Sequence, residues 1–257
     1  MRTRLTDHPL AVRLASLALV LLAWEWYGRR VDRIFLSYPT AIAAAAGEML
    51  RSGELPAAML ASAWPLAAGF LAGVGAGVVV GFLMGRYRLL EWLLDPLVNA
   101  FYATPGTAIL PLLMLWFGLG VTVKIVIVFS FTIFPVLVNT FIGVRDISAA
   151  HVDVARAFGA REREIIAKVL VPAALPFIAT GVRLAVGRAI VGMIAAEFFT
   201  ALSGLGQIIV ASGNAYDTDR LFVAILVLAL AGVGLTRLVE AAEDRLAAWK
   251  LTERAQA

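Results

Sequence analysis

Six long apolar runs dominate this chain and limit what it can fold into. The hydrocarbon core of a bilayer is about 30 Å thick, so a helix needs about 20 apolar residues to cross it. The runs cover residues 10–27, 61–85, 93–117, 121–144, 175–202 and 221–238. The sequence therefore predicts an all-α integral membrane protein with about six transmembrane helices. Between the first two runs, residues 39–51 predict a short amphipathic helix at the membrane surface.

Composition supports this class and excludes several others. Hydrophobic residues make up 61% of the chain and charged residues 16%, whereas a soluble domain needs far more polar surface. Cysteine is absent, and His8 and His151 show no metal-ligand spacing, so we expect no disulfide and no metal site. No basic patch interleaves with aromatic residues, which argues against a nucleic-acid partner and leaves membrane lipid as the surroundings.

The first apolar run has two interpretations. Arg2 and Arg4 in front of it are also typical of a secretory signal peptide. No small-x-small cleavage site follows, and Trp24, Trp26 and Tyr27 are typical of the interfacial anchors of a retained helix.

Positive charge predicts the orientation, because cytoplasmic segments of membrane proteins carry the excess of lysine and arginine. With the N-terminus inside, the inner segments hold Arg2, Arg4, Arg13, Arg86, Arg88, Arg145, Arg156, Arg161, Arg163, Lys168, Arg237, Arg245, Lys250 and Arg254. The outer segments hold Arg29, Arg30, Arg33, Arg51, Lys124 and Arg220. Both termini are therefore predicted to be cytoplasmic, although the cluster around Arg29 opposes the rule.

The second run carries glycine at every fourth residue, at Gly69, Gly73, Gly77, Gly81 and Gly85. This spacing leaves one helix face without side chains, so another helix of the chain can approach closely. A phosphate-binding loop is the alternative, but the G-x-G-x-x-G spacing is missing and no strand precedes the glycines.

Pro105 and Pro111 interrupt the third run, with Asn99 and Thr104 nearby, and Asn139 follows a proline in the fourth run. Proline frees backbone carbonyls, which is tolerated at membrane depth where protein or a water-filled cavity receives them. The segment is either a simple kink or part of a transport pathway.

The fifth run contains Arg183, Arg188 and Glu197. A charge at the bilayer centre costs about 2.5–3.5 kcal/mol on insertion scales, so it rarely faces lipid. Arg183 and Glu197 share one helical face at about 100° per residue, and Arg183 can also extend to the inner surface. For the deeper Arg188, structural pairing and a place beside an anion pathway both stay open. Candidate pathway residues are Asn99, Thr104, Pro105, Asn139, Arg183, Arg188 and Glu197.

A polar segment, residues 145–168, separates the fourth and fifth runs. Asp146 or Ser148 can cap a short helix, and Gly159 can end it because glycine readily adopts a positive φ. Three apolar residues recur at three-residue spacing: Val152, Ala155 and Phe158. Read alone, this pattern also fits an interfacial amphipathic helix. A second charged helix starts near Glu162, and two prolines bracket the return to the membrane: Pro172 and Pro176.

The run DVARAFG at 153–159, followed after nine residues by VLVP at 169–172, resembles the Glu-Ala-Ala loop of permeases in binding-protein-dependent ABC importers. Ala155, Gly159 and Pro172 match that pattern directly. Four positions carry mild replacements: Asp153 for Glu, Val154 for Ala, Val169 for Ile and Val171 for Leu.

Other segments resemble the branch of this family that serves nitrate, taurine and aliphatic sulfonates: ATPGTAILPLLMLWFGLG, FPVLVNTFIGVRDI, LPFIATGVRLAVG, AAEFF and SGLGQII. The resemblance covers residues 35–250. It implies a single permease domain over 1–257, with its core at 55–245 and the first span within 1–30. Arg188 departs from the branch, where an apolar residue is more usual.

The resemblance implies a mechanism. The short helix before Gly159 would be a coupling helix that docks on a cytoplasmic ABC ATPase subunit. The residues implied in coupling are Val152, Asp153, Ala155, Arg156, Phe158, Gly159 and Pro172. The sequence contains no G-x-x-x-x-G-K-[ST] motif, so ATP and Mg²⁺ are expected on that partner and no cofactor on this chain.

Further partners follow from the same resemblance. A periplasmic or lipid-anchored substrate-binding protein would deliver a small anionic solute such as an aliphatic sulfonate, nitrate or taurine. A permease homodimer would form the pathway in the bacterial cytoplasmic (inner) membrane.

Two other classes of membrane protein make different predictions. A secondary transporter driven by an ion gradient predicts inverted repeats, and the sequence shows no convincing repeat. A membrane-embedded enzyme needs a nucleophile with its base or a metal cluster. No such set is visible, so we expect no catalytic residue and a transport subunit that is not an enzyme.

Overall fold

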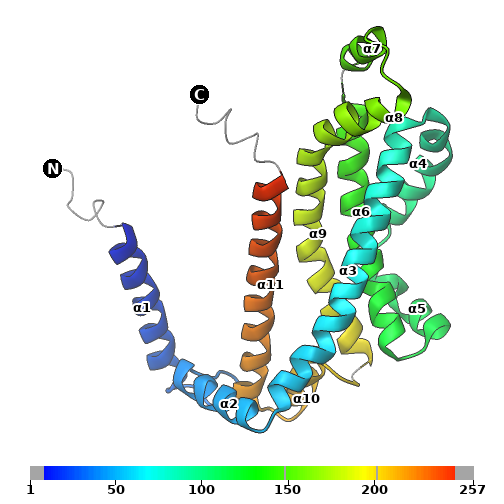
Figure 1. The fold of residues 1–257 in the computed structure, drawn as a ribbon. Coiled ribbons are helices and arrows are strands. Elements are labelled where there is room, and N and C mark those ends of the chain that lie inside the picture. The colour runs from blue at the N-terminus through cyan, green and yellow to red at the C-terminus, as the bar shows by residue number, and fades with distance from the viewer. Residues whose placement is uncertain (1–8, 148, 201, 247–257) are drawn as a thin grey trace. The chain divides into compact units, whose positions relative to one another are not determined.

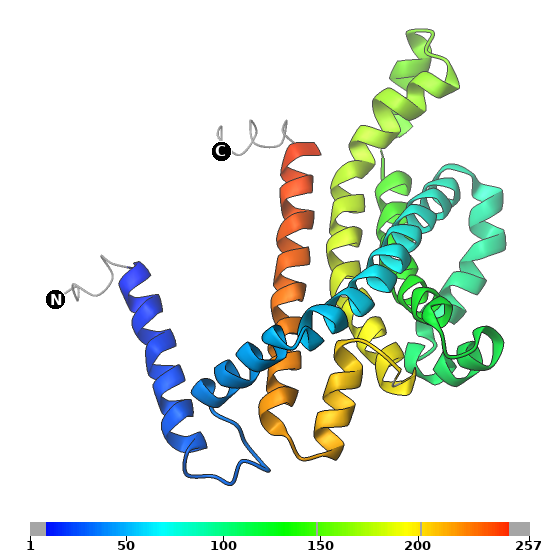
Figure 2. The same cartoon turned by 60° about the horizontal axis from the view of Figure 1, so that its bottom comes forward.

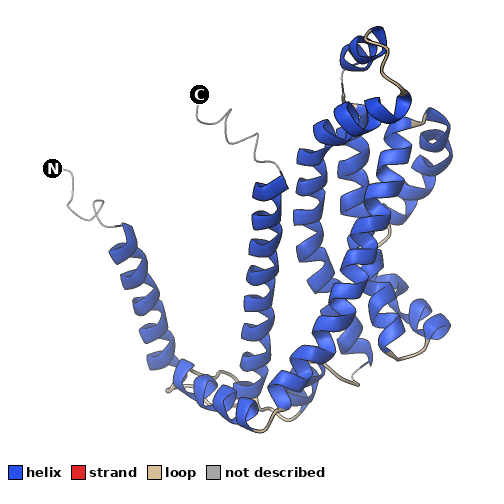
Figure 3. Cartoon of the chain, viewed as in Figure 1, coloured by secondary structure: helices blue, strands red, loops and turns tan. Residues whose placement is uncertain are grey.

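The computed structural model describes residues 9–147, 149–200 and 202–246, and within them the chain is helical with no strand (Figures 1 and 3). The α-helices are α1 Pro9–Gly28, α2 Pro39–Arg51, α3 Glu54–Arg86, α4 Arg88–Ala103, α5 Leu110–Phe117, α6 Val121–Arg145, α7 Ala149–Ala157, α8 Glu162–Ile165, α9 Val171–Thr200, α10 Leu205–Asn214 and α11 Thr218–Leu246. Two other helical turns are the 3₁₀ helix η2, Gly106–Ile109, and the π-helix η3, Ile166–Leu170.

The helices confirm the predicted membrane class. Five of them are long and apolar enough to cross a bilayer, and α4 with the η2–α5 segment makes a sixth candidate if this bent pair counts as one span. All six coincide with the apolar runs of the sequence, and the third run is the bent one, as its prolines indicated.

The described chain divides into two compact units. The first comprises Met1–Ala61 with Ser203–Leu228, and the second Ser62–Leu202 with Ala229–Ala257, apart from the undescribed residues within them. Each unit is described by itself below, and the prediction of a single permease domain stays a prediction.

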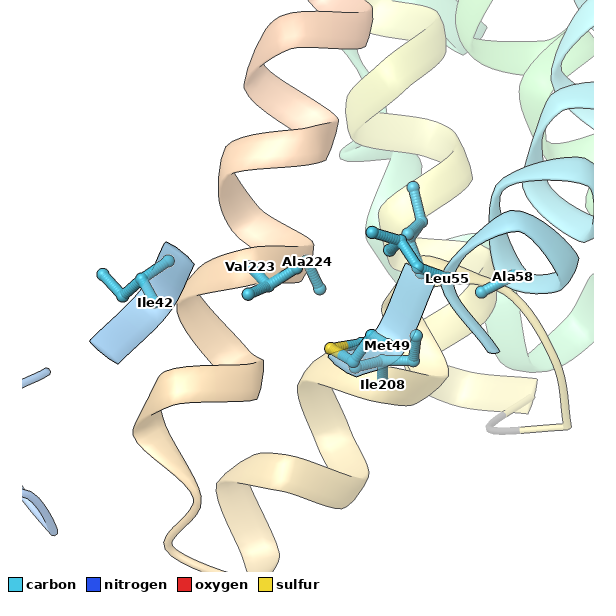
Figure 4. Close-up of a cluster of buried hydrophobic side chains, with 8 residues drawn as sticks. Ile42, Met49, Leu55, Ala58, Ile208, Val223 and Ala224 are labelled. Carbon is cyan, nitrogen blue, oxygen red and sulfur yellow. The ribbon is translucent and has the colours of Figure 1, made fainter. Parts of the chain in front are cut away.

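The first unit has an apolar core to which α2, α10 and the ends of α3 and α11 contribute (Figure 4). Ile42 and Met49 of α2 pack there with Ile208 and Val223. The segment 39–51 is therefore helical as predicted, but one of its faces is buried in protein.

The arginine cluster that opposed the charge rule lies in this unit and is largely compensated. Arg29 donates to Glu25 at 2.6 Å, and Arg33 donates to Asp219 at 2.8 Å. The Arg30 guanidinium lies 3.7 Å from the centre of the Trp26 ring, a favourable cation–π geometry. Two of the three arginines are therefore paired with carboxylates, and Arg30 keeps its positive charge.

The glycine face of α3 lies directly against α6 in the second unit, and Figure 2 shows the two helices side by side. A Cβ atom at Gly73 would lie 2.7 Å from Cβ of Thr132, and one at Gly77 would lie 2.8 Å from Cβ of Val136. Because these positions carry no side chain, the two helices approach more closely than larger residues would allow.

Helix α9 packs antiparallel on α6, again through glycines. Gly143 of α6 receives the Phe177 side chain, Gly181 of α9 lies against Val136, and Gly192 lies against the Phe131 ring. Small residues thus set the spacing on both sides of α6.

Helix α11 runs antiparallel to α9, since Gly232 lies beside Ile190 and Glu243 pairs with Arg183. The C-terminal end of α11 and the polar segment 145–168 therefore lie at the same end of this unit. The charge distribution assigned both to the same side of the membrane. That this side is cytoplasmic stays a prediction.

Three details differ from the sequence expectations. Lys124, counted among the outer loop charges, is buried in the first turn of α6, with 2% of its side chain exposed. Asp146 is the residue that ends α6 rather than the cap of the next helix, and Ser148 lies outside the described residues. The second charged helix and the fifth apolar run, expected as separate segments, form one continuous path through α8, η3 and α9. Pro172 has no amide hydrogen, and the preceding turn widens so that the Val171 amide reaches the carbonyl of Ile166.

The α3–α6 contact gives a test with an internal control. Replacing Gly77 by Ala places a methyl group 2.8 Å from Ile133 O and Val136 Cβ, so we expect the protein in detergent to lose about 1–3 kcal/mol of stability. In the same helix, the methyl group of Gly75→Ala would have no neighbour within 4 Å, so this variant should keep the wild-type melting temperature or raise it slightly. Equal melting curves for the two variants would contradict the close packing.

Candidate coupling loop and transport cavity

Helix α7 and the turn that ends it form the core of the polar segment. Gly159 has φ of +78°, which a residue with a side chain rarely adopts. Its amide donates to Arg156 O at 2.9 Å, and the Ala160 amide donates to Ala155 O at 3.0 Å. This pair of bonds is a Schellman motif, so Gly159 stops the helix as the sequence predicted.

The segment after Gly159 is fixed at its base. The Arg161 amide donates to the Glu164 carboxylate at 2.9 Å, which caps the start of α8. The Arg86 Nε donates to Glu162 at 2.8 Å, so the C-terminal end of α3 is joined to α8. A displacement of α7 therefore acts on both α3 and α9.

The exposed apolar face of α7 differs from the predicted stripe. Phe158 is 88% exposed and Val154 is 56% exposed, and residues four apart lie on one helix face. Val152 and Ala155, expected with Phe158 in the stripe, are half-buried. Asp153 and Arg156 are exposed and pair at 3.6 Å. Of the other implied coupling residues, Gly159 ends α7 and Pro172 lies in the first turn of α9.

A cavity of about 170 Å³ lies among the α4–η2 segment, α6 and α9. Its lining comprises Phe101, Tyr102, Thr104, Gly106, Ile109, Ser130, Phe131, Phe134, Pro135 and Arg188. The α6 and α9 residues come from the middle of those helices. The break after Thr104 bends the third run by 91°, so this segment is more than a kink, and Thr104, Gly106 and Ile109 line the cavity.

Aromatic rings form much of the cavity wall. The Phe134 ring centre lies 6.3 Å from those of both Phe101 and Tyr102, on α4. Phe131 is fixed by two glycines, because a Cβ at Gly106 would lie 2.8 Å from its ring and one at Gly192 would lie 2.9 Å from it. The ring of Phe131 thus joins the broken segment to α9.

Among the described residues that line this cavity, Arg188 is the only charged one. Its side chain is exposed, and among the described residues no Asp or Glu lies within 4 Å of its guanidinium. The sequence left open whether Arg188 forms a structural ion pair. In the described part of the chain, Arg188 has no such partner.

The structure brings only some of the candidate pathway residues together. Thr104 and Arg188 line the same cavity, and Pro105 lies at the break beside it. Asn99 donates to Asp95 at 2.9 Å within α4. Asn139 donates to Pro135 O at 2.8 Å within α6. Neither asparagine lines the cavity.

The other two candidates have separate surroundings. Arg183 pairs with Glu243 of α11. Glu197 is fully buried and accepts hydrogen bonds from Ser62 Oγ at 2.8 Å and Lys124 Nζ at 3.2 Å. In the described chain, no three His, Asp or Glu residues gather closely enough to hold a metal ion.

The Lys124–Glu197 pair was missed at the sequence level. The signal was present, because Lys124 lies only four residues into an apolar run, where a cation needs a partner. The partner could not be chosen from the sequence, since Glu197 is 73 positions away.

Comparisons with known proteins agree with the membrane fold. A family model described as "Binding-protein-dependent transport system inner membrane component" matches residues 73–248. A probable ABC transporter permease protein of Brucella abortus (strain 2308) is 34% identical over 97% of this chain and 99% of its own length.

Two further relatives have named solutes. A putative aliphatic sulfonates transport permease protein of Bacillus subtilis (strain 168) is 34% identical over 91% of this chain and 85% of its own length. A taurine transport system permease protein of Escherichia coli (strain K12) is 32% identical over 67% of this chain and 63% of its own length.

The buried pair gives a stability prediction. Lys124→Met leaves the Glu197 carboxylate without its buried cation, so we expect a loss of about 3–5 kcal/mol. Lys168→Met removes the exposed ion pair with Glu164 and should change stability by less than about 1 kcal/mol. Thermal unfolding of both variants in the same detergent measures the difference, and similar melting temperatures would contradict the role of Lys124.

Proposed function

This chain belongs to the family of binding-protein-dependent transport system inner membrane components, and from this membership we propose a specific role. It is the permease subunit of an ABC importer that translocates a small anionic solute, such as an aliphatic sulfonate, nitrate or taurine. The named solutes of two relatives support the anionic class. The comparisons give no support to the alternative of a transporter driven by an ion gradient.

The exposed apolar face of α7 is the observation that carries the role. A phenylalanine that is 88% exposed in a charged loop is suited to insert into a groove on a partner. Buried aromatic anchors commonly dominate the free energy of such interfaces. The partner is a cytoplasmic ATPase subunit that holds ATP and Mg²⁺, and the flanking Asp153 and Arg156 set the register of docking.

The connections of the loop explain how docking could drive transport. Closure of the ATPases displaces α7, and the Arg86–Glu162 pair and the continuous α8–η3–α9 path carry this displacement to α3 and α9. Because α9 also lines the cavity, the motion alters the space around Arg188. A periplasmic or lipid-anchored binding protein supplies the solute, and a second permease chain completes the assembly. The loop and both termini face the cytoplasm.

The turn at Gly159 gives the first test of docking. Valine at this position must adopt a positive φ or unwind the turn, at a cost of about 1–3 kcal/mol. Gly159→Val should therefore reduce copurification of the co-expressed ATPase by about tenfold, with normal membrane insertion. The matched control is Gly53→Val, because Gly53 has φ of +79° but lies between α2 and α3. Equal ATPase recovery from both variants would contradict the role of the loop.

Phe158 gives the second test. Phe158→Ala removes the exposed ring without straining the backbone, and we expect at least a tenfold loss of ATPase affinity, as for a central anchor residue. Phe35→Ala removes another highly exposed ring from the first unit and should leave binding unchanged. Titration of the purified ATPase onto each variant in nanodiscs measures both affinities. Wild-type affinity in the Phe158 variant would show that α7 docks through another face.

A further inference from the structure

We propose that the cavity among α4–η2, α6 and α9 binds an organic monoanion. Its solute is a sulfonate or carboxylate with an apolar or aromatic body, and Arg188 holds the acid group. This inference rests on the proposed transport function and narrows the class of solute. Within the anionic solutes considered above, it favours sulfonates without an amino group over both nitrate and taurine.

The sign of the ligand charge follows from Arg188. A guanidinium at mid-length of a membrane span is costly to place against lipid, and no carboxylate of the described chain compensates it. Arginine presents its N–H groups in a planar fork that matches carboxylate and sulfonate oxygens. An anion in the cavity supplies the missing charge.

The body of the ligand follows from the walls. Phe101 and Phe134 lie nearly parallel, with 22° between their ring planes, and Tyr102 and Phe131 extend the same apolar surface. Pockets lined by aromatic rings with few polar groups recognise ligands whose body is largely apolar. A hydrocarbon chain or ring attached to the acid group can pack against these faces.

The few hydrogen-bond donors of the cavity leave its apolar walls to distinguish an organic anion from a small inorganic one. Ser130 donates its hydroxyl hydrogen to Val126 O at 2.8 Å, and Thr104 donates to Ala100 O at 2.8 Å. Toward a ligand in the cavity, both hydroxyl oxygens can therefore only accept hydrogen bonds. The remaining side-chain donors are the Arg188 guanidinium and the Tyr102 hydroxyl. Nitrate meets the same two donors as a sulfonate but has no apolar body to pack against the rings, so it gains less from this cavity.

The same lining disfavours a zwitterion such as taurine. No Asp or Glu is found among the described residues that line the cavity, so an ammonium group meets no opposite charge from them. It also lies near the positive charge of Arg188. Cation–π contact with the rings recovers only about 0.5–2 kcal/mol, which is small against the cost of removing an ammonium group from water.

The test uses 4-fluorobenzenesulfonate as the probe, with the full chain in nanodiscs and its copurified ATPase. Fluorine NMR line broadening reports weak binding directly, and empty nanodiscs give the background. We expect saturable broadening that methanesulfonate and benzoate reverse, whereas nitrate and taurine at the same concentration do not. Arg188→Gln should weaken binding at least tenfold. The control is Arg237→Gln, because Arg237 lies outside the cavity on α11.

Two outcomes would overturn the proposal. Equal binding by Arg188→Gln and the wild type would remove Arg188 from the site, and displacement of the probe by nitrate or taurine as effective as by benzoate would refute the ligand class. If the Gln variant does not fold, Arg188→Lys and Phe134→Leu replace it, each with an expected threefold or greater loss. Unchanged affinity in both would also refute the site. ATPase copurification is read separately, so failure of the transport role is distinguished from failure of this site.

Discussion

The second unit depends on how closely α3 and α9 approach α6. In a bilayer the hydrophobic effect gives little drive for helices to associate, so van der Waals packing between close backbones must supply the attraction. Glycines supply this on both sides of α6, from α3 at Gly73 and Gly77 and from α9 at Gly181 and Gly192. The cavity and the loop have fixed positions relative to each other only because these three helices form one block.

Charges within the helices divide into three kinds once this packing is known. Glu197 and Lys124 are buried against each other, which joins the end of α9 to the start of α6. Arg183 lies on α9, on the loop side of Arg188, and pairs with Glu243 of α11. Arg188 lies between these positions and faces a cavity without a carboxylate. A structural role accounts for the first two kinds, whereas Arg188 has no carboxylate partner within the described chain.

The sequence predicted those features that depend on local chemistry. Apolar length set the spans, because a helix must satisfy its own backbone in lipid, and Gly159 marked the end of α7 because its conformation is local. The exposed face of α7 was predicted less well, since spacing identified Val152 with Phe158 but not which face the loop covers. The Lys124–Glu197 pair and the cavity could not be predicted, because each joins segments far apart in sequence.

The break after Thr104 explains where movement of the helix block can be accommodated. Helices α3, α6 and α9 are held by close contacts along their lengths, so they resist sliding past one another. Helix α4 has no buried residue of its own, and η2 is held to the block through the contact of Gly106 with Phe131. Glu162 and Arg188 lie on one continuous helical path, which rises about 1.5 Å per residue, so a displacement at Glu162 can reach Arg188 along the helix. The opposite wall of the cavity, formed by α4 and η2, contains a 91° bend. The two walls thus differ in how firmly they are held, and under the proposed docking mechanism we expect a change in the cavity to arise mainly from motion of the block against the broken segment.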